Sequence, residues 1–459
     1  MQIFDHTIAA LSTPPGKGGV ALIRISGRDA RDVAERVFHA KSGKSVFALA
    51  PRCAVYGDVL FEGEAIDDVL LTVFPAPNSY TGEDTVEITC HGASPIVEAI
   101  LSALFAAGAM PAAPGEFTRR AFVAGKLSLS EAEAIGELLD AKSLSGVKLF
   151  GRDSRHRLSV ALSSLYEDVC HLLSSLLAVI DYPDEDLAEL SEDEILMRLG
   201  EIEARGRRLL ATYRTGSAVK DGIPTVLLGK PNTGKSTLYN LLCGREAAIV
   251  TEIAGTTRDV LEATVPLGRV LLRLSDTAGV RESEDAVERI GVLRSKEAAE
   301  RASLVFVLFD GARACDAEDE ALLSFLDTLS GVKVALLNKS DLASAFDASV
   351  LEGHVSHVLP FSAKTGDTTA LSALVDRLFT DDSLTIGEDA ILFSPRAYAA
   401  LLRGCEALSR AAEALRATGA VDAALMEAES ALAAFAECDG KEVSEDVVSD
   451  IFKHFCVGK

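Results

Sequence analysis

The chain has 459 residues, a formal net charge of −24 and 48% hydrophobic residues. A chain of this length is expected to hold two to four domains, each with its own core. The strong acidity argues against a protein that grips nucleic acid by charge alone, although a local basic patch or an RNA partner held by another subunit stays open. The longest apolar runs, Leu172–Ile180 and Leu304–Phe309, are too short to span a membrane.

The start of the chain and its cysteines bear on the compartment. Residues Met1–Asp5 lack the basic stretch and the apolar core of a signal peptide. The eight cysteines are scattered singly, without a C-x-x-C motif or a Cys/His cluster, so they indicate neither a zinc site nor a disulfide scaffold. We therefore expect a cytoplasmic protein in a reducing compartment, without a membrane partner.

The first 120 residues alternate between segments typical of strands and of helices. Three segments have the β-rich composition of strands, namely Gly19–Ile25, Asp67–Phe74 and Thr85–Thr89. A helix is expected to start at Ser94-Pro95 and to stop at Gly108. This alternation predicts an N-terminal α/β domain over residues 1–120.

A helical texture follows and is later interrupted. After residue 120 Pro and Gly become sparse and apolar residues recur at helical spacing, and Ser130 with Glu133 has the spacing of a capping box. Strand and helix alternate again over residues 217–380, and an Ala/Leu-rich helical texture returns after that. The pattern predicts one helical domain, made of residues 121–216 and 381–459, that is split by an inserted α/β domain at residues 217–380.

A phosphate-binding loop opens the inserted domain. Gly229–Thr237 fits the pattern G-x-x-x-x-G-K-S/T, in which backbone N–H groups cradle phosphates, the Lys reaches the β/γ oxygens and the Ser hydroxyl ligates Mg²⁺. The preceding Thr225–Leu228 is typical of a strand, and the following Thr237–Cys243 is typical of a helix that ends at Gly244. This strand–loop–helix context argues against a chance match.

Downstream motifs distinguish GTP from ATP. Asn338-Lys339-Ser340-Asp341 matches N-K-x-D, whose Asp carboxylate accepts two N–H bonds that guanine offers and adenine does not. Ser362-Ala363-Lys364 would supply backbone donors to the guanine oxygen. Asp276-Thr277-Ala278-Gly279 would hold the water shell of Mg²⁺ and sense the γ-phosphate, and Thr257, in Gly255–Asp259, would be a second hydroxyl ligand of the ion.

The hydrolysis chemistry departs from that of many GTPases. Val280 stands directly after Gly279, where a Gln commonly orients the attacking water. Several carboxylates between Arg281 and Glu288 could polarise water instead, although a solvated acidic loop is the alternative for most of them. Asn232 is the second unusual feature, because a side-chain amide there could ligate a monovalent cation in place of an arginine finger.

These features resemble the potassium-activated translation-factor-like GTPases, and the two ends of the chain narrow the resemblance. Five segments carry it in the N-terminal part: Thr7-Ile8-Ala9-Ala10, Pro14–Val20, Ser79–Asp84, Cys90-His91-Gly92 and Pro114–Phe122. The sixth is the C-terminal Phe455-Cys456-Val457-Gly458-Lys459. Together they are similar to the MnmE (TrmE) family of bacterial tRNA-modification GTPases over essentially the whole chain. Lys230, Thr233 and Val457 replace the family's usual Arg, Ala and Ile.

The resemblance implies a multidomain fold of the α/β plus α-helical class. An N-terminal α/β domain would bind tetrahydrofolate, and a Ras-like P-loop GTPase domain would be inserted into a discontinuous helical domain. The implied GTP-binding residues are Asn232, Thr233, Gly234, Lys235, Ser236, Thr237, Thr251, Glu252, Ile253, Ala254, Gly255, Thr256, Thr257, Asp276, Thr277, Ala278, Gly279, Asn338, Lys339, Asp341, Ser362, Ala363 and Lys364. Mg²⁺ would be held by Ser236 and Thr257, and K⁺ by Asn232, Thr251, Ile253 and Thr256. Glu288 would be the catalytic residue that orients water.

The implied folate site consists of Arg24, Glu87, Lys126 and Lys459. A carboxylate in a strand can accept from pteridine N–H groups, and cationic side chains suit the carboxylates of the folate tail. Without the resemblance, these residues would be read as solvated charges. Cys456 is either apolar packing beside Phe455 or a functional thiol near one-carbon chemistry.

The resemblance also implies a function and partners. A potassium-activated homodimeric GTPase would form a heterotetramer with a flavin-dependent partner of the MnmG (GidA) family, which carries FAD. The pair would add a carboxymethylaminomethyl-type group to carbon 5 of the wobble uridine of certain tRNAs, using 5-formyl- or 5,10-methylene-tetrahydrofolate. The alternatives are a ribosome-assembly or signalling switch, and a folate-dependent one-carbon transferase with a regulatory GTPase insert.

Overall fold

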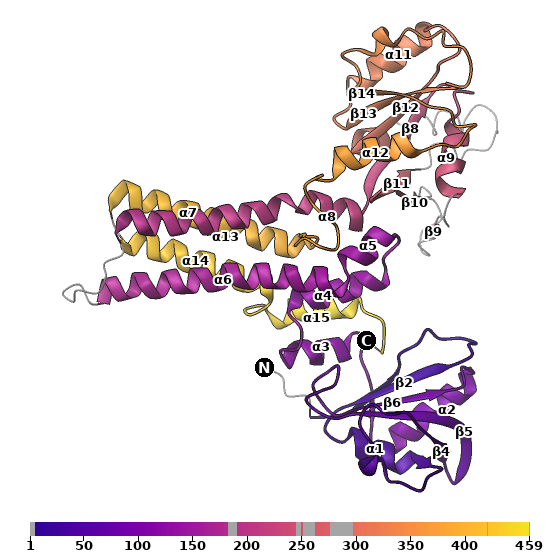
Figure 1. Cartoon of the computed structure of the whole chain (residues 1–459), viewed down its shortest axis with the longest axis vertical. Helices are drawn as coiled ribbons and strands as arrows, with labels where there is room; N and C mark the ends of the chain where they lie inside the picture. The colour runs from indigo at the N-terminus through magenta and orange to yellow at the C-terminus, as the bar shows by residue number, and fades with distance from the viewer. Residues whose placement is uncertain are drawn as a thin grey trace. The chain divides into compact units, whose positions relative to one another are not determined.

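The computed structural model describes residues 5–181, 191–244, 249–250, 262–275, 297–419 and 421–458. The chain forms two compact units, whose helices and strands are labelled in Figure 1. The first consists of Met1–Gly136, Ser159–Ile202 and Arg403–Lys459, and the second of Glu137–Leu158 and Glu203–Leu402. Among the helices in the described part of the chain, none is long and apolar enough to cross a membrane.

The first unit contains a seven-stranded sheet. Its strands are β1 (Ile8–Leu11), β2 (Ala21–Ser26), β3 (Phe38–Ala40), β4 (Val55–Phe61), β5 (Glu64–Phe74), β6 (Thr85–Cys90) and β7 (Met110–Pro111). The order is β3-β4-β5-β6-β2-β1-β7, and every pair is antiparallel except β1 with β7. The three strands predicted from composition are confirmed as β2, β5 and β6.

One face of this sheet carries the core. Alternate residues such as Ile23, Ile25 and Ile88 are fully buried and belong to one cluster with side chains of α1 (Ala30–Val37) and α2 (Ser94–Ala106). Burying an aliphatic side chain of this size contributes about 1.5–3 kcal/mol. Because successive side chains of a strand alternate between faces, the residues between these buried positions point to the other face of the sheet.

Helices make up the rest of the first unit and part of the second. Their bounds are α3 (Glu116–Val123), α4 (Leu129–Leu139), α5 (Leu144–Leu149), α6 (Arg152–Asp181), α7 (Glu192–Ala211), α8 (Tyr213–Lys220), α13 (Pro395–Thr418), α14 (Val421–Asp439) and α15 (Glu445–Lys453). Ion pairs Arg403–Glu437 and Arg410–Glu427 join α13 to α14 in antiparallel fashion. Gly404 makes this contact possible, because a Cβ there would lie 2.1 Å from the ring of Phe435.

The start of α4 corrects one prediction. The capping box is formed by Ser128 and Glu131, not by Ser130 and Glu133: the N–H of Glu131 donates to Ser128 Oγ at 3.2 Å, and the N–H of Ser128 donates to Glu131 Oε2 at 3.0 Å. The sequence offers two overlapping Ser-x-x-Glu segments, and local spacing does not separate them. The earlier one places Leu129, which is fully buried, in the first turn of the helix.

The second unit contains the other seven-stranded sheet. Its strands are β8 (Ile223–Gly229), β9 (Ile249–Val250), β10 (Glu262–Leu267), β11 (Val270–Ser275), β12 (Leu304–Asp310), β13 (Val332–Asn338) and β14 (His357–Pro360). The order is β14-β13-β12-β8-β11-β10-β9. Strand β10 runs antiparallel to both neighbours, and the other pairs are parallel.

Both faces of this sheet are covered, as a parallel sheet requires. One core cluster joins the sheet to α9 (Lys235–Gly244) and α12 (Thr369–Phe379), and a second joins it to α11 (Ala317–Leu326) (Figure 1). The phosphate loop connects the central strand β8 to α9. The unit therefore has the Ras-like P-loop arrangement that the motifs predict.

Candidate nucleotide and cofactor sites

The phosphate loop spans the gap between the end of β8 at Gly229 and the start of α9 at Lys235. Its backbone takes positive φ at Gly229 (145°), Asn232 (63°) and Gly234 (102°). A Cβ at Gly229 would lie 2.6 Å from the Leu308 carbonyl oxygen of the neighbouring strand, so only glycine allows this close approach. Asn is among the few residues with a side chain that tolerate the left-handed conformation found at position 232.

Lys235 points back into this loop. Its Nζ donates to the carbonyl oxygens of Gly229 and Lys230, each at 2.6 Å. Burial lowers the pKa of Lys235, because the loop shields the ammonium from water. A lysine held at the loop in this way is placed to meet phosphate oxygens. Ser236 and Thr237 are exposed in the first turn of α9, where the positive end of the helix dipole favours an anion.

Asn338 ties the phosphate loop to the predicted base-binding segments. Its side chain is buried at the end of β13; Nδ2 donates to the carbonyl oxygen of Thr233 at 2.7 Å, and Oδ1 accepts from the N–H of Ala363 at 2.9 Å. Three predicted segments, far apart in the sequence, therefore meet at one amide group.

Asp341 and Ser362 form the next contact of the base site. The hydroxyl of Ser362 donates to Asp341 Oδ1 at 2.7 Å, and this hydrogen bond holds the pKa of Asp341 below its ordinary value. The carboxylate is therefore ionised at neutral pH, as an acceptor of guanine N–H groups must be. Lys339 has a φ of 65° and pairs with Asp310 at 2.6 Å, and Lys364 is exposed.

The remaining nucleotide-site predictions fall outside the described residues. These are Thr251, Glu252, Ile253, Ala254, Gly255, Thr256, Thr257, Asp276, Thr277, Ala278, Gly279 and Glu288. Of the predicted metal ligands, the structure describes Asn232 and Ser236.

In the first unit, the structure brings Arg24 and Glu87 together. They are cross-strand neighbours of β2 and β6, and the Arg24 Nε and Nη2 atoms lie 2.9 and 2.8 Å from Glu87 Oε1. The guanidinium also lies 5.4 Å from the ring centroid of Tyr80 and 5.7 Å from that of Phe117, within cation–π range. The family resemblance implies both residues for one site, and the ion pair between them appears only in the structure.

Lys126, the other described member of the folate prediction, and the possible functional thiol Cys456 lie in the same unit. Lys126 Nζ donates to the carbonyl oxygen of Pro77 at 2.8 Å. Cys456 is exposed, and its carbonyl oxygen accepts from the N–H of Gly115 at 3.4 Å. The Ser12 hydroxyl, just after β1, donates to the carbonyl oxygen of Gly458 at 3.0 Å. The C-terminal tail therefore lies beside the strand that pairs with β2, whereas Lys459 lies outside the described residues.

A buried polar network next to this site was not foreseen. Arg120 is 2% exposed and makes ion pairs with Glu116 at 2.7 Å and with Glu83 at 3.0 Å. Glu83 also accepts from the Ser26 hydroxyl at 2.8 Å. The spacing of Glu116 and Arg120, four residues apart on one helix, was the available signal. The network holds the segment that contains Tyr80 against β2, and removing one partner would leave a buried charge.

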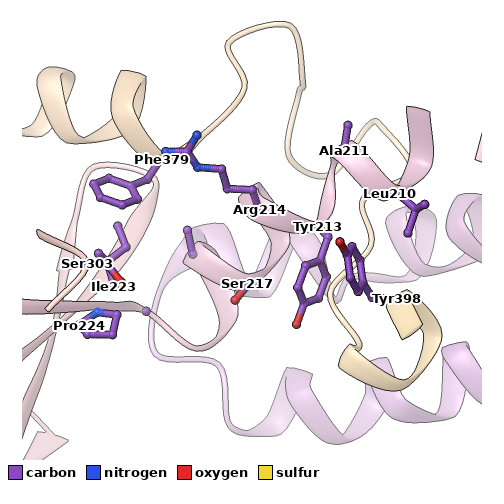
Figure 2. Close-up of a pocket in the computed structure, with 12 residues that line it drawn as sticks. Leu210, Ala211, Tyr213, Arg214, Ser217, Ile223, Pro224, Ser303, Phe379 and Tyr398 are labelled. Carbon is purple, nitrogen blue, oxygen red and sulfur yellow. The ribbon is translucent and has the colours of Figure 1, made fainter. Parts of the chain in front are cut away.

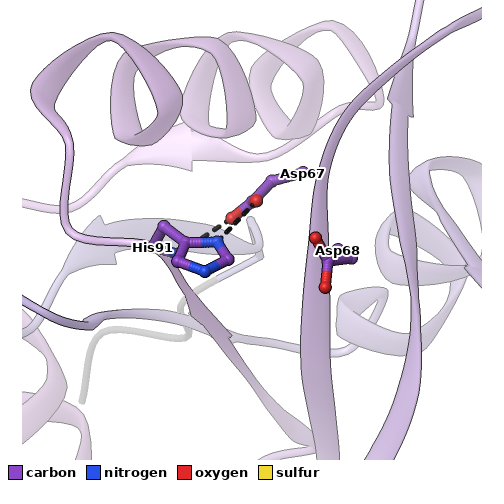
Figure 3. A group of neighbouring side chains, drawn as sticks. All are labelled: Asp67, Asp68 and His91. Carbon is purple, nitrogen blue, oxygen red and sulfur yellow. Dashed lines mark hydrogen bonds and ion pairs between the residues drawn. The ribbon is translucent and has the colours of Figure 1, made fainter.

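His91, Asp67 and Asp68 form a second unforeseen group (Figure 3). His91 Nδ1 lies 2.8 Å from Asp67 Oδ1, and the N–H of His91 donates to Asp67 Oδ2 at 2.8 Å. The hydrogen bond to Asp67 raises the pKa of His91. The pairing of β5 with β6 brings these residues together, so the sequence alone gave no sign of the group.

A pocket of about 530 Å³ lies where the chain enters and leaves the nucleotide-binding sheet (Figure 2). The rings of Tyr213 and Tyr398 are 4.4 Å apart at their centroids, and the Arg214 guanidinium lies 5.5 Å from the ring of Phe379. Arg214 also donates to the carbonyl oxygen of Leu378. Aromatic rings and one guanidinium thus join α8 to the ends of α12 and α13.

The Ras-like sheet, the loop that holds Lys235 and the Asn338 link to Asp341 and Ser362 together define a P-loop protein of the GTPase class. Two family models match the chain: "GTP-binding protein TrmE N-terminus" over residues 7–126 and "MnmE helical domain" over residues 129–456.

Curated relatives match along the whole length. The chain is similar to the tRNA modification GTPase MnmE of Heliobacterium modesticaldum, with 40% identity over 464 residues and 99% of each chain covered. The MnmE proteins of Natranaerobius thermophilus (36% identity, covering 99% of this chain and 100% of the relative) and of Carboxydothermus hydrogenoformans (34%, covering 100% of both) are further relatives. The chain therefore belongs to the MnmE family of tRNA modification GTPases.

Proposed function

We propose that the protein hydrolyses GTP to GDP and uses this cycle in the modification of the wobble uridine of certain tRNAs. The observation that supports guanine as the base is the ionised carboxylate of Asp341, which accepts a hydrogen bond from Ser362. Asn338 bonds to the next residue, Ala363, and to Thr233, and so joins this segment to the phosphate loop. Guanine offers two donors to this carboxylate, N1–H and the 2-amino group, whereas adenine has an unprotonated N1 and a C–H at position 2, so an ATP-bound site would leave the carboxylate unpaired.

The loop residues have separate parts in hydrolysis. Lys235 would exchange its two carbonyl partners for phosphate oxygens, and the exposed Ser236 hydroxyl suits Mg²⁺, a cation that prefers oxygen ligands, together with Thr257. A bound Mg²⁺ would supply neutralisation of phosphate charge. The exposed amide of Asn232 suits K⁺, with Thr251, Ile253 and Thr256 as further ligands. Val280 has no polar atom with which to orient water, and we assign that task to Glu288 because the resemblance to the MnmE family implies it.

For the N-terminal site we propose a one-carbon tetrahydrofolate, 5-formyl or 5,10-methylene. The Arg24 Nε and Nη2 atoms both contact Oε1 of Glu87, so Oε2 can accept from a pteridine amino group. Lys126 and Lys459 would face the tail carboxylates. The tail residue Cys456 is exposed beside this domain, which is compatible with a functional thiol as well as with packing.

We further propose a homodimer that forms a heterotetramer with an FAD-dependent partner of the MnmG (GidA) family. The partner would transfer electrons through its flavin, and the product would be a carboxymethylaminomethyl-type uridine. The net charge of −24 supports this division, because a chain so acidic is poorly suited to hold most of the tRNA phosphates itself.

Nucleoside analysis of tRNA from a deletion strain tests the proposal. We expect the modified wobble uridine to disappear and to return when the wild-type gene is restored. Unchanged tRNA would favour a ribosome-assembly or signalling switch. In a second assay the purified protein is supplied with tRNA and a one-carbon folate, and modified uridine formed without the flavoprotein would favour a stand-alone transferase.

A further inference from the structure

Lys230, the first residue after β8, is held from two sides. Its carbonyl oxygen accepts from Lys235 Nζ at 2.6 Å and from the Thr233 hydroxyl at 2.8 Å, both inside the phosphate loop. Its side chain leaves the loop in the other direction and reaches the first turn of α11. There Nζ contacts Asp316, with Asp319 Oδ1 at 3.3 Å.

The α11 side of this contact is a preformed charge network. Asp319 is fully buried and accepts from Arg313 Nη2 at 3.0 Å and from the N–H of Asp316 at 3.2 Å. Arg313 Nη1 lies 2.7 Å from Asp316 Oδ2, and Glu318 lies 3.4 Å from Lys230 Nζ. Two cations therefore meet three carboxylates, of which Asp319 is sealed from water.

The ion pairs of this network hold the ammonium group of Lys230 away from the nucleotide side of the loop. Burial alone would lower the pKa of Lys230, but hydrogen bonds to Asp316 and Asp319 outweigh burial and raise it. The ammonium stays protonated and directed at α11, and its side chain is only 13% exposed. Within the described part of the loop, this leaves Lys235 as the lysine that turns inward.

We propose that Lys230 and the Asp316–Asp319 carboxylates form an anchor that holds the phosphate loop in shape and slows nucleotide release. This rests on the proposed binding of GTP and GDP in the loop. A phosphate that draws Lys235 away from the Lys230 carbonyl removes one of the bonds that hold the loop. The Thr233 hydroxyl bond and the Lys230 side chain then remain as the ties at this end of the loop, and Lys230 is a positioning residue that does not touch the nucleotide.

The test measures dissociation of the fluorescent mant-GDP from the full-length protein by stopped flow. For Lys230→Met we expect dissociation about tenfold faster, because the phosphate loop loses the ion pairs that tie it to α11 and holds the phosphates less firmly. The KM for GTP should rise, while kcat at saturating GTP stays within about twofold, since no group that contacts the reacting atoms is removed. Lys230→Arg keeps the charge and should restore slow release.

Lys333→Met is the matched control. Lys333 Nζ donates to the carbonyl oxygen of Leu326 at 2.9 Å, at the other end of α11, so this variant loosens the same helix away from the loop. The anchor is supported if Lys333→Met releases mant-GDP at the wild-type rate and Lys230→Met releases it faster. Equal release rates for the Lys230→Met and wild-type proteins, or the same acceleration in Lys333→Met, would overturn it.

Asp316→Asn gives a second measurement that does not disturb the buried carboxylate. Asp316 is half-exposed, so the variant is expected to fold, and faster mant-GDP release is expected again. Unchanged release from Asp316→Asn together with unchanged release from Lys230→Met would remove the inference and leave the proposed function intact. If wild-type protein bound no mant-GDP at all, the proposed function itself would fail.

Discussion

Replacing Asn338 by Ala would cut the link between the phosphate loop and the base-binding segments. The side chain is 4% exposed, and its two hydrogen bonds reach the Thr233 carbonyl and the Ala363 N–H. The methyl group of Ala can replace neither bond. The fold around it should persist, because the change removes no apolar core residue.

The expected size of the effect follows from these two bonds. A buried donor or acceptor left without a partner costs about 1–3 kcal/mol, so two such groups cost roughly 2–6 kcal/mol together. Water that enters the space of the lost amide should keep the effect near the lower end. In the free variant these groups can reach water only if the segments move apart, so nucleotide binding must realign them; about 2–3 kcal/mol for this step corresponds to a loss of nucleotide affinity of roughly 30- to 150-fold.

Titration of mant-GDP measures the affinity, and thermal unfolding of the same samples separates lost binding from lost folding. Asn240→Ala is the control, because Asn240 is exposed on α9. Affinity within threefold of wild type for Asn338→Ala, with an unchanged Tm, would refute the view that this amide organises the site.

Three further predictions concern ions, catalysis and pH. Replacing Na⁺ by K⁺ should raise the hydrolysis rate, and Asn232→Ala should abolish the difference; equal wild-type rates in both salts would remove Asn232 as a cation ligand. Glu288→Ala should keep GTP affinity and lose most turnover, and retained turnover would move the role to Glu282, Glu284 or Asp285. The stabilisation from the His91–Asp67 pair should be complete below the ordinary pKa of His and be lost as the pH rises through the raised pKa of His91. Thermal unfolding between about pH 6 and 8.5 checks this: Tm should fall with pH in wild type, and a slope that His91→Gln leaves unchanged would contradict the assignment.

Local patterns predicted the parts of the site that depend on neighbouring residues. The phosphate loop lies between a strand and a helix because Thr225–Leu228 is apolar and β-rich and Gly229 and Gly234 supply the required positive φ. The Asn338 segment was predicted from the N-K-x-D match of residues 338–341, which are again close neighbours in the sequence. In both cases the residues that make up the motif lie within about ten positions of one another in the sequence.

The contacts that the sequence did not predict depend on tertiary packing. The Arg24–Glu87 pair joins residues 63 positions apart and exists because β2 pairs with β6 in one particular register. Lys230 and Asp316 are 86 positions apart, and they meet because β8 and β12 are adjacent and α11 follows β12. The N-terminal cap of α4 shows the same dependence on packing at short range. Two Ser-x-x-Glu segments fit the capping-box spacing equally well, and the one that forms the cap places Leu129 in the core.

The short helix α8 contacts both the segment that enters the nucleotide-binding sheet and the segment that leaves it. α8 leads directly into β8, and it also holds the returning chain: the Thr215 hydroxyl oxygen accepts from the N–H of Asp381 at 3.0 Å. Just before α8, the Thr212 hydroxyl oxygen accepts from the N–H of Leu392 at 2.9 Å. Gly216 lets the two segments touch, because a Cβ there would lie 2.0 Å from the Leu392 carbonyl oxygen. Since the returning chain bonds to α8 and to the residue just before it, we expect a displacement of β8 relative to α8 to strain the segment that leads to α13 as well.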